Sequence, residues 1–196
     1  MYRRKPIVLA FAGPNGSGKT TIARKLPTIG TYINADDIKK EYGLTDIVAA
    51  ESAESLRSSL LEKGLDFSFE TVLSTERNLL LLEKAKERGY EIQCIYVLTC
   101  DENINVAGVR ARCAAGGHDV PEDKIRTRYH RALALVPRLA KICDKLLIYD
   151  NSDTPALIFS KDNTKFNIYA NKFWPEQAIR KLLTKPSVEG GNLCYT

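Results

Sequence analysis

The sequence predicts an α/β fold, a three-layer sandwich with a five-stranded, mainly parallel sheet that is followed by a C-terminal hairpin and helix. Three observations predict it. Residues 7–12 form a short, continuous apolar run, as expected of a parallel strand buried on both faces. Four more strand-like segments alternate with segments of helical periodicity, which favours parallel strands joined by right-handed crossovers. A glycine-rich turn, residues 13–20, comes directly after the first strand and before a helix.

The glycine-rich turn fits the pattern G-x-x-x-x-G-K-[ST] of a phosphate-binding P-loop. Its glycines allow successive backbone N–H groups to point at one phosphate chain, and the next helix directs its positive end at the same anion. Lys19 supplies a mobile charge for the β- and γ-phosphates, and the Thr20 hydroxyl can bind Mg²⁺. The alternative is a glycine-rich turn that binds nothing. The pattern therefore predicts a P-loop NTPase-type fold with Thr20 as metal ligand and a nucleotide site made of Gly13, Pro14, Asn15, Gly16, Ser17, Gly18, Lys19, Thr20 and Thr21.

The segments after the P-loop are assigned from their periodicity and their start and stop signals. Thr45 and Asp101 can begin helices, and Gly64 and Gly89 can end them. Pro121 suits the first turn of a helix whose apolar positions continue through residue 136. Strands are expected at 31–34, 66–71, 90–99 and 145–149, a hairpin at 156–169, and helices at 21–26, from 35, at 45–63, 76–88, 101–115, from 121 and at 175–183.

Length and composition fit one domain that needs no metal or disulfide to fold. The chain has 196 residues and a net charge of +5, from 29 Lys and Arg against 24 Asp and Glu. The basic residues form no long run, so nucleic acid is not an expected partner. Five cysteines without a C-x-x-C pair indicate neither a zinc site nor a disulfide framework. Since no stretch approaches the roughly 20 apolar residues of a membrane span, we expect a cytoplasmic protein without a membrane partner. One domain is expected at 1–185, with a lid at about 101–140 and a mobile tail at 186–196.

Polar residues that follow the strands are candidates for chemistry, because ligands of parallel sheets bind at the carboxyl ends of strands. Asp36 follows the second strand, where an acceptor hydroxyl would lie opposite the P-loop, and is the candidate base. The alternative is that Asp36 or Asp37 caps a helix. Glu70 and Thr71 end the third strand and are expected to bind the acceptor, while Glu70 could instead hold Mg²⁺ through water or be a solvated acid. Residues 150–151 end the last core strand.

Five arginines flank the Gly-Gly break at 116–117, and such a group suits a lid that closes over a triphosphate. A guanidinium can neutralise the charge of the transferring phosphoryl group. Arg110 and Arg112 are about 200° apart on a helix, so they are expected to serve different purposes. The alternative is an ordinary solvated basic face. The group consists of Arg110, Arg112, Arg126, Arg128 and Arg131.

Taken together, these motifs resemble the zeta toxin family of P-loop kinases. The Gly-Gly-His-x-Val-Pro segment with its arginines is the most specific of them. The chain is short for this family, and Asn34 stands where some members have an acidic residue. The matching segments are G-P-N-G-S-G-K-T-T (13–21), I-N-A-D-D-I (33–38), F-E-T-V-L-S (69–74), R-C-A-A-G-G-H-D-V-P (112–121), I-R-T-R-Y (125–129) and Y-D-N-S (149–152), which span most of the chain.

The resemblance implies ATP-dependent phosphorylation of a hydroxyl group with Mg²⁺. In characterised members the acceptor is the 3′-hydroxyl of UDP-N-acetylglucosamine. The implied partners are therefore a small-molecule phosphoacceptor and an antitoxin protein. The site residues that the resemblance implies are Asp36 as catalytic base, Lys19 as phosphate clamp, Glu70 as acceptor-side carboxylate, and Arg112 with Arg126 or Arg128 as lid cations.

Two other functions compete with a small-molecule kinase. One is a non-catalytic ATP-binding module regulated by a partner. It would have no use for an acceptor-side carboxylate, so Asp36 and the lid arginines favour the kinase. The other is a nucleotide or polynucleotide kinase. The mild net charge and the lack of a basic and aromatic stripe argue against a polynucleotide.

Overall fold

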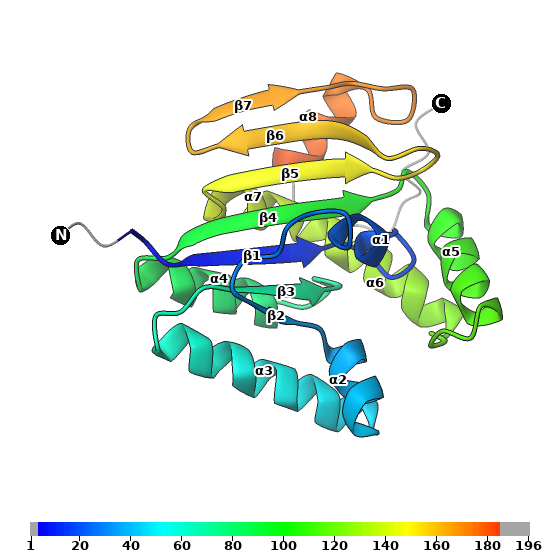
Figure 1. Ribbon diagram of the computed structural model, residues 1–196. Helices are drawn as coiled ribbons and strands as arrows, with labels where there is room; N and C mark the ends of the chain where they lie inside the picture. Colours follow the sequence, from blue (N-terminus) through cyan, green and yellow to red (C-terminus); the bar gives the residue numbers. More distant parts are fainter. Residues whose placement is uncertain (1–3, 185–196) are drawn as a thin grey trace.

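The computed structural model describes residues 4–184, which form one sheet with helices around it (Figure 1). The strand order is β2-β3-β1-β4-β5-β6-β7, parallel from β2 to β5 and antiparallel for β6 and β7. The predicted five parallel strands are confirmed, but the predicted hairpin extends the same sheet to seven strands within the described residues. The expected boundary at 185 and the tail at 186–196 lie outside those residues. The strands are β1 Ile7–Ala12, β2 Thr31–Ile33, β3 Phe67–Thr71, β4 Glu91–Leu98, β5 Lys145–Asp150, β6 Ala156–Asp162 and β7 Lys165–Ile168.

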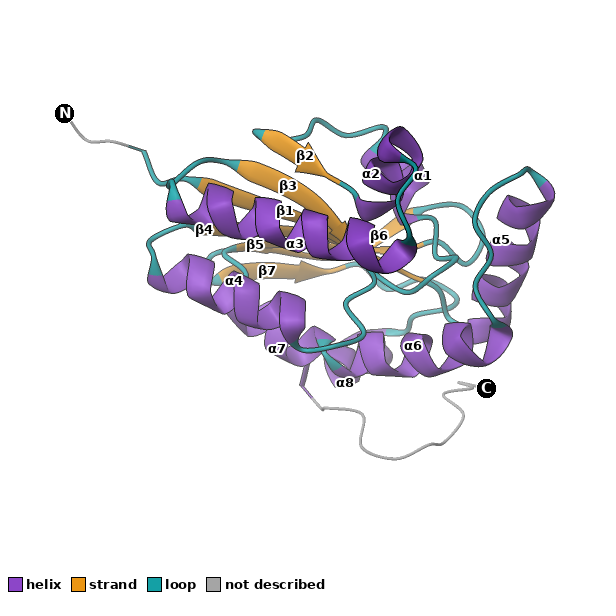
Figure 2. Ribbon diagram, turned by 90° about the horizontal axis from the view of Figure 1, so that it is seen from below, coloured by secondary structure: helices purple, strands orange, loops and turns teal. Residues whose placement is uncertain are grey.

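Helices α3, α4, α6, α7 and α8 lie on one face of the sheet (Figure 2). The single helix expected from Pro121 through Val136 is wrong: α6 ends at Ala134 and α7 begins at Val136. Pro137 in the first turn of α7 explains the break, because proline cannot continue a helix. None of the described helices is long and apolar enough to cross a membrane. The helices are α1 Lys19–Ala23, α2 Ala35–Tyr42, α3 Asp46–Glu62, α4 Arg77–Glu87, α5 Glu102–Ala114, α6 Glu122–Ala134, α7 Val136–Ile142 and α8 Glu176–Thr184.

The sheet buries a different apolar core on each face, as the alternation of side chains along β1 shows. Val8 and Ala10 belong to the large core beneath the five helices. Leu9 and Phe11 point the other way and pack with Ile22 of α1 in a smaller core. The two outer layers of the predicted sandwich therefore differ in size, with a large core on one face of the sheet and a small one on the other.

Two predicted helix starts are confirmed by their capping bonds. The Thr45 hydroxyl accepts a hydrogen bond from the Val48 amide at 3.4 Å, at the start of α3. The Asp101 carboxylate accepts one from the Asn103 amide at 2.7 Å, at the start of α5. Such side-chain oxygens satisfy amides that have no partner within the helix.

The pairing of β1 brings several polar segments to one edge of the sheet. β1 lies between β3 and β4, so its last residue, Ala12, pairs with Thr71 and Tyr96. β2 runs parallel beside β3, and β5 beside β4. The P-loop at 13–20 and the residues that follow β2, β3 and β5 therefore meet at the carboxyl edge.

We predict that two adjacent leucines of α4 differ in their contribution to stability. Leu79 is completely buried, whereas Leu80 is 52% exposed. Leu79→Ala should lower the free energy of unfolding by about 2–5 kcal/mol, because it leaves a cavity in the core. Leu80→Ala should change it by less than about 0.5 kcal/mol. Denaturant unfolding of both variants measures this, and equal losses would contradict the assigned face of α4.

Candidate nucleotide-binding site

The P-loop is in direct backbone contact with α5. A Cβ on Gly16 would lie 2.1 Å from the Asn105 carbonyl oxygen, and one on Gly108 would lie 2.5 Å from the Gly16 carbonyl oxygen. No side chain fits at either position. Asn105 is completely buried, and its Nδ2 donates to the Asn15 carbonyl at 2.6 Å while its Oδ1 accepts from the Thr99 hydroxyl. These contacts fix one side of the loop.

The other side of the P-loop is fixed from the end of β5. Asn151 Nδ2 donates to the Ser17 carbonyl at 2.9 Å, and the Asn151 amide donates to the Leu98 carbonyl at 2.8 Å. Within the loop, the Ser17 amide donates to the Pro14 carbonyl at 3.3 Å. The loop is therefore held by residues from two other segments, as expected of a preorganised anion site.

Lys19 extends back over the P-loop, and its Nζ donates to the Pro14 carbonyl at 2.9 Å. Burial lowers the pKa of Lys19 to about 8, although the Glu70 and Asp36 carboxylates raise it. The Arg112 guanidinium lowers this pKa further. The ammonium group therefore has two carboxylates and one guanidinium within electrostatic reach, and an anion beside it would favour its charged form.

Glu70 connects the P-loop with β2. The Thr20 hydroxyl donates to Glu70 Oε2 at 2.9 Å, and the Tyr32 hydroxyl donates to Glu70 Oε1. Burial and the Glu70 carboxylate raise the pKa of Tyr32 well above its usual value. Oxygen atoms are the ligands that Mg²⁺ prefers, and it commonly takes one or two protein oxygens together with phosphates and water. The Thr20 and Glu70 oxygens therefore fit a Mg²⁺ site.

The two aspartates of α2 do not cap this helix. Its N-cap is Asn34, whose Oδ1 accepts from the Asp36 amide at 2.9 Å. Asp36 and Asp37 are both exposed in the first turn. The charge of Asp36 acts on Lys19, whereas that of Asp37 acts on Tyr32. Asp36 therefore lies on the P-loop side of α2 and is not required as its cap.

Thr71 and Thr21 are the two predicted site threonines other than the metal ligand Thr20, and they lie in different surroundings. Thr71 is buried, and its hydroxyl accepts from the Leu73 amide at 2.9 Å and from Asn78 Nδ2 at 2.7 Å. It thereby fixes the connection between β3 and α4. Thr21 is exposed in the first turn of α1, next to Thr20.

Two of the predicted lid arginines are close to the P-loop. Arg128 of α6 donates from Nη1 to Asn15 Oδ1 at 3.4 Å. Arg112 of α5 donates from Nη2 to the His118 carbonyl at 2.8 Å, and its charge acts on Lys19. They approach the loop from two helices of the lid region.

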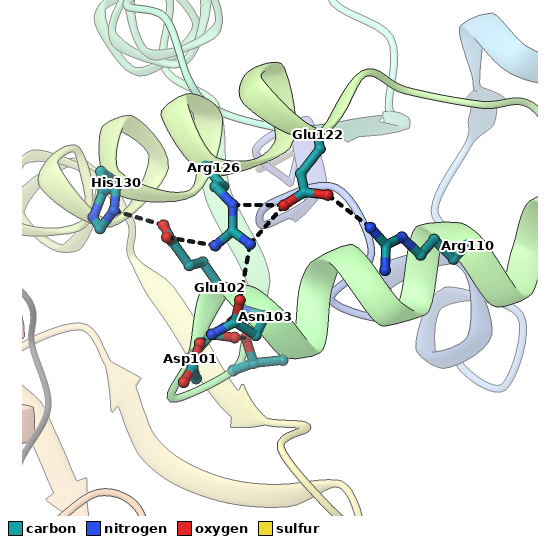
Figure 3. Close-up of polar contacts among 8 residues, drawn as sticks. Asp101, Glu102, Asn103, Arg110, Glu122, Arg126 and His130 are labelled. Atoms are coloured by element: carbon teal, nitrogen blue, oxygen red, sulfur yellow. Dashed lines mark hydrogen bonds and ion pairs between the residues drawn. The ribbon is translucent and has the colours of Figure 1, made fainter.

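The third predicted lid arginine, Arg126, is engaged in a network of carboxylates between α5 and α6 (Figure 3). Its Nη1 lies 2.7 Å from Glu102 Oε1, and its Nε lies 3.0 Å from Glu122 Oε1. Glu122 also pairs with Arg110 at 2.8 Å, and Glu102 with His130 at 2.7 Å. Arg126 therefore ties the two helices together, and its charge is already balanced.

Sequence reasoning missed two residues that shape the site, Asn105 and Tyr32. Asn105 carried a usable signal, because it is a polar residue on the face of α5 that buries Val106 and Val109. Such a residue usually makes a required hydrogen bond. Tyr32 carried no comparable signal, because aromatic residues are common in strands for packing reasons alone.

Comparison with known proteins gives a family match over most of the chain. A protein-family model described as zeta toxin matches residues 1–163. A protein of Haemophilus influenzae, described as uncharacterized, is 30% identical over 125 residues, which are 61% of this chain and 89% of that protein.

Solved structures share the fold at low sequence identity. A chain of the AvrRxo1-ORF1:-ORF2 complex with ATP matches with a TM-score of 0.72 and 14% identity over 94% of this chain. The match covers 65% of that chain, so the present chain spans less than two thirds of its length. A structure of the PezAT chromosomal toxin-antitoxin system of Streptococcus pneumoniae matches with a TM-score of 0.58 and 21% identity, over 93% of this chain and 80% of that one.

We predict that one added methyl group between α5 and the P-loop impairs nucleotide binding. The Cβ of Gly108→Ala would meet the Gly16 carbonyl, so helix or loop must move at a cost of about 1–3 kcal/mol. ATP affinity, measured by calorimetry, should fall by about tenfold or more. Ala107→Ser is the control, because residue 107 is exposed on the same helix. Normal affinity in Gly108→Ala would show that the contact does not shape the loop.

Proposed function

Since this chain belongs to the zeta toxin family, we propose that it is an ATP-dependent kinase that transfers the γ-phosphoryl group to a hydroxyl of a small molecule, with a UDP-activated amino sugar as the first candidate acceptor. Family membership supports the kinase class. The observation that carries the proposal is the charge arrangement at Lys19, where the carboxylates of Asp36 and Glu70 act on a P-loop ammonium.

Each residue has a role that follows from its place. The P-loop amides and Lys19 would bind the β- and γ-phosphates. Thr20 and Glu70 would hold Mg²⁺, which supplies positive charge to the phosphates. Asp36 would accept the proton of the acceptor hydroxyl, since its carboxylate is exposed beside the phosphate site. Arg112 and Arg128 would neutralise charge on the transferring group.

A regulatory partner is part of the proposal. The PezAT structure is described as a toxin-antitoxin system. An antitoxin protein is accordingly a candidate partner of this chain, and the partner-regulated ATP-binding module is the competing function. Phosphoryl transfer separates the two, because a binding module would bind ATP without phosphorylating any acceptor.

We predict that Asp36→Asn abolishes phosphoryl transfer without weakening ATP binding. Because Asn34 caps α2, the substitution should leave the melting temperature unchanged. The assay uses γ-labelled ATP with a panel of UDP-sugars, nucleosides and small alcohols, beside calorimetry for ATP affinity. Asp37→Asn is the matched control and should remain active. Full activity in Asp36→Asn, or loss only in Asp37→Asn, would place the base elsewhere.

We also predict that two of the lid arginines contribute to catalysis and the third to stability. Arg112→Ala and Arg128→Ala should each lower kcat by about 10²-fold or more, if their charge acts on the transition state. The affinity for ADP should change much less. Arg126→Ala should mainly lower the melting temperature, because Arg126 pairs with Glu102 and Glu122. Single-turnover kinetics and thermal unfolding test this, and near-normal kcat in both of the first two variants would assign these arginines to a solvated face.

A further inference from the structure

The lid loop, residues 116–119 between α5 and α6, carries a histidine whose side chain does not belong to the phosphate site. His118 is part of the Gly-Gly-His-x-Val-Pro segment. Its Nε2 lies 3.9 Å from Oδ2 of Asp46, a residue in the first turn of α3. Among residues 4–184 this pair is the only hydrogen bond or ion pair that joins the lid region to α2 or α3.

The lid loop and the side chain of Arg112 form one unit. Arg112 donates from Nη2 to the His118 carbonyl at 2.8 Å, and the Gly117 amide donates to the Arg112 carbonyl at 2.9 Å. A Cβ on Gly117 would lie 2.6 Å from Arg112 Cγ, so the side chain and the loop are in contact. A displacement of the lid loop therefore displaces the guanidinium whose charge acts on Lys19.

Asp46, on the other side of the contact, is held by α2. Lys39 Nζ donates to Asp46 Oδ1 at 2.7 Å, which leaves Oδ2 to face His118. The Lys39 ammonium holds the pKa of Asp46 below its usual value, and His118 contributes in the same direction. Lys39 follows Asp36 by three residues, so the two side chains are neighbours on α2. Asp46 is therefore fixed to the helix that carries the candidate base.

The lid and the α2–α3 pair of helices thus approach each other at two places. Inside, Asp36 of α2 and Arg112 of α5 both act on the half-buried Lys19. Outside, Asp46 and His118 meet with side chains that are 61% and 46% exposed. Both α2 and the connection from α5 to α6 lie at the carboxyl edge of the sheet (Figure 1). A molecule between Asp36 and Arg112 would therefore have the His118–Asp46 pair on its solvent side.

An exposed pair of this kind is weak, which suits a contact that has to open. Ion pairs in water contribute little because solvent and salt screen them, and a lid must open in every cycle to admit substrate and release product. Asp119, next to His118, accepts through Oδ1 from the Val120 amide at 2.8 Å and from the Cys113 thiol at 3.3 Å. His118 therefore finds its acidic partner across the gap and not within its own loop.

We propose that His118 is a positioning residue that latches the lid to Asp46 of α3, and that this latch holds Arg112 over the phosphate site while an acceptor is enclosed. The consequence for turnover rests on the proposed kinase function, whereas the latch itself does not. Without the latch the lid opens more often. Arg112 then spends less time at the transferring group, and a bound acceptor dissociates faster.

Hydrogen exchange of the lid tests the latch without any need for turnover. The exchange of the backbone amides of residues 112–120 is followed by mass spectrometry in the protein alone, so that no nucleotide is required. His118→Gln and Asp46→Asn should each speed this exchange about threefold, a change of the size that an exposed ion pair permits. Lys39→Met is the matched control and should exchange like the wild type, because it removes only the other partner of Asp46.

A double-mutant cycle distinguishes the latch from two unrelated surface residues. If His118 and Asp46 act on each other, the double variant should exchange no faster than either single variant. His118→Lys should restore the wild-type rate, because it keeps a cation opposite Asp46. The proposal is overturned by wild-type exchange in both single variants, by additive effects in the double variant, or by an equal effect of Lys39→Met.

Steady-state kinetics connect the latch with the proposed reaction. With UDP-N-acetylglucosamine as acceptor, His118→Gln should lower kcat about threefold and raise the KM for the acceptor by about the same factor, while the KM for ATP stays unchanged. Faster exchange with unchanged kcat and acceptor KM would overturn the positioning of Arg112 by the latch. If this acceptor is not phosphorylated at all, the proposed acceptor is wrong, and the exchange cycle alone decides whether the latch exists.

Discussion

The direct contact between α5 and the P-loop is the constraint on which the site depends. Two glycines, Gly16 and Gly108, let two backbones touch where no side chain fits. Asn105 then uses both ends of its amide, one on the Asn15 carbonyl and one on Thr99. Each unmade hydrogen bond of a buried amide would cost about 1–3 kcal/mol, so the loop can move away from α5 only at considerable cost. A phosphate would thus meet a loop that is already shaped.

This fixed loop also determines where charge collects. Lys19 is half-buried against it, and desolvation lowers the pKa of Lys19 to about 8, so that the charges of its neighbours matter. The carboxylates from β3 and α2 raise the pKa of Lys19, whereas the guanidinium from α5 lowers it. An incoming polyphosphate would change this balance in favour of the charged lysine. The charges of the site are therefore arranged around one side chain, Lys19, and they come from three separate elements of the fold.

Much of this arrangement could be predicted from the sequence, because the deciding signals are local. The apolar run of β1, the P-loop pattern and the caps at Thr45 and Asp101 each depend on a few neighbouring residues. The hairpin was recognised, but its addition to the sheet was not, since strand pairing depends on distant segments. The placement of Glu70 beside Thr20 followed from topology, whereas the hydrogen bond from Tyr32 that orients Glu70 depends on packing.

The arginines show most clearly what the sequence leaves open. Arg126 and Arg128 are two residues apart and belong to the same basic segment, so composition and spacing treat them alike. The helix turns them to different sides: Arg126 meets Glu102 and Glu122, while Arg128 reaches Asn15 of the P-loop. Arg57, in contrast, looks like an ordinary surface arginine in the sequence and proves to be buried over the ring of Phe69. What an arginine can do depends on whether its charge is already balanced, and only the fold determines which carboxylates come within reach. An arginine that reaches the P-loop, as Arg128 does, is therefore more informative than the number of arginines in the segment.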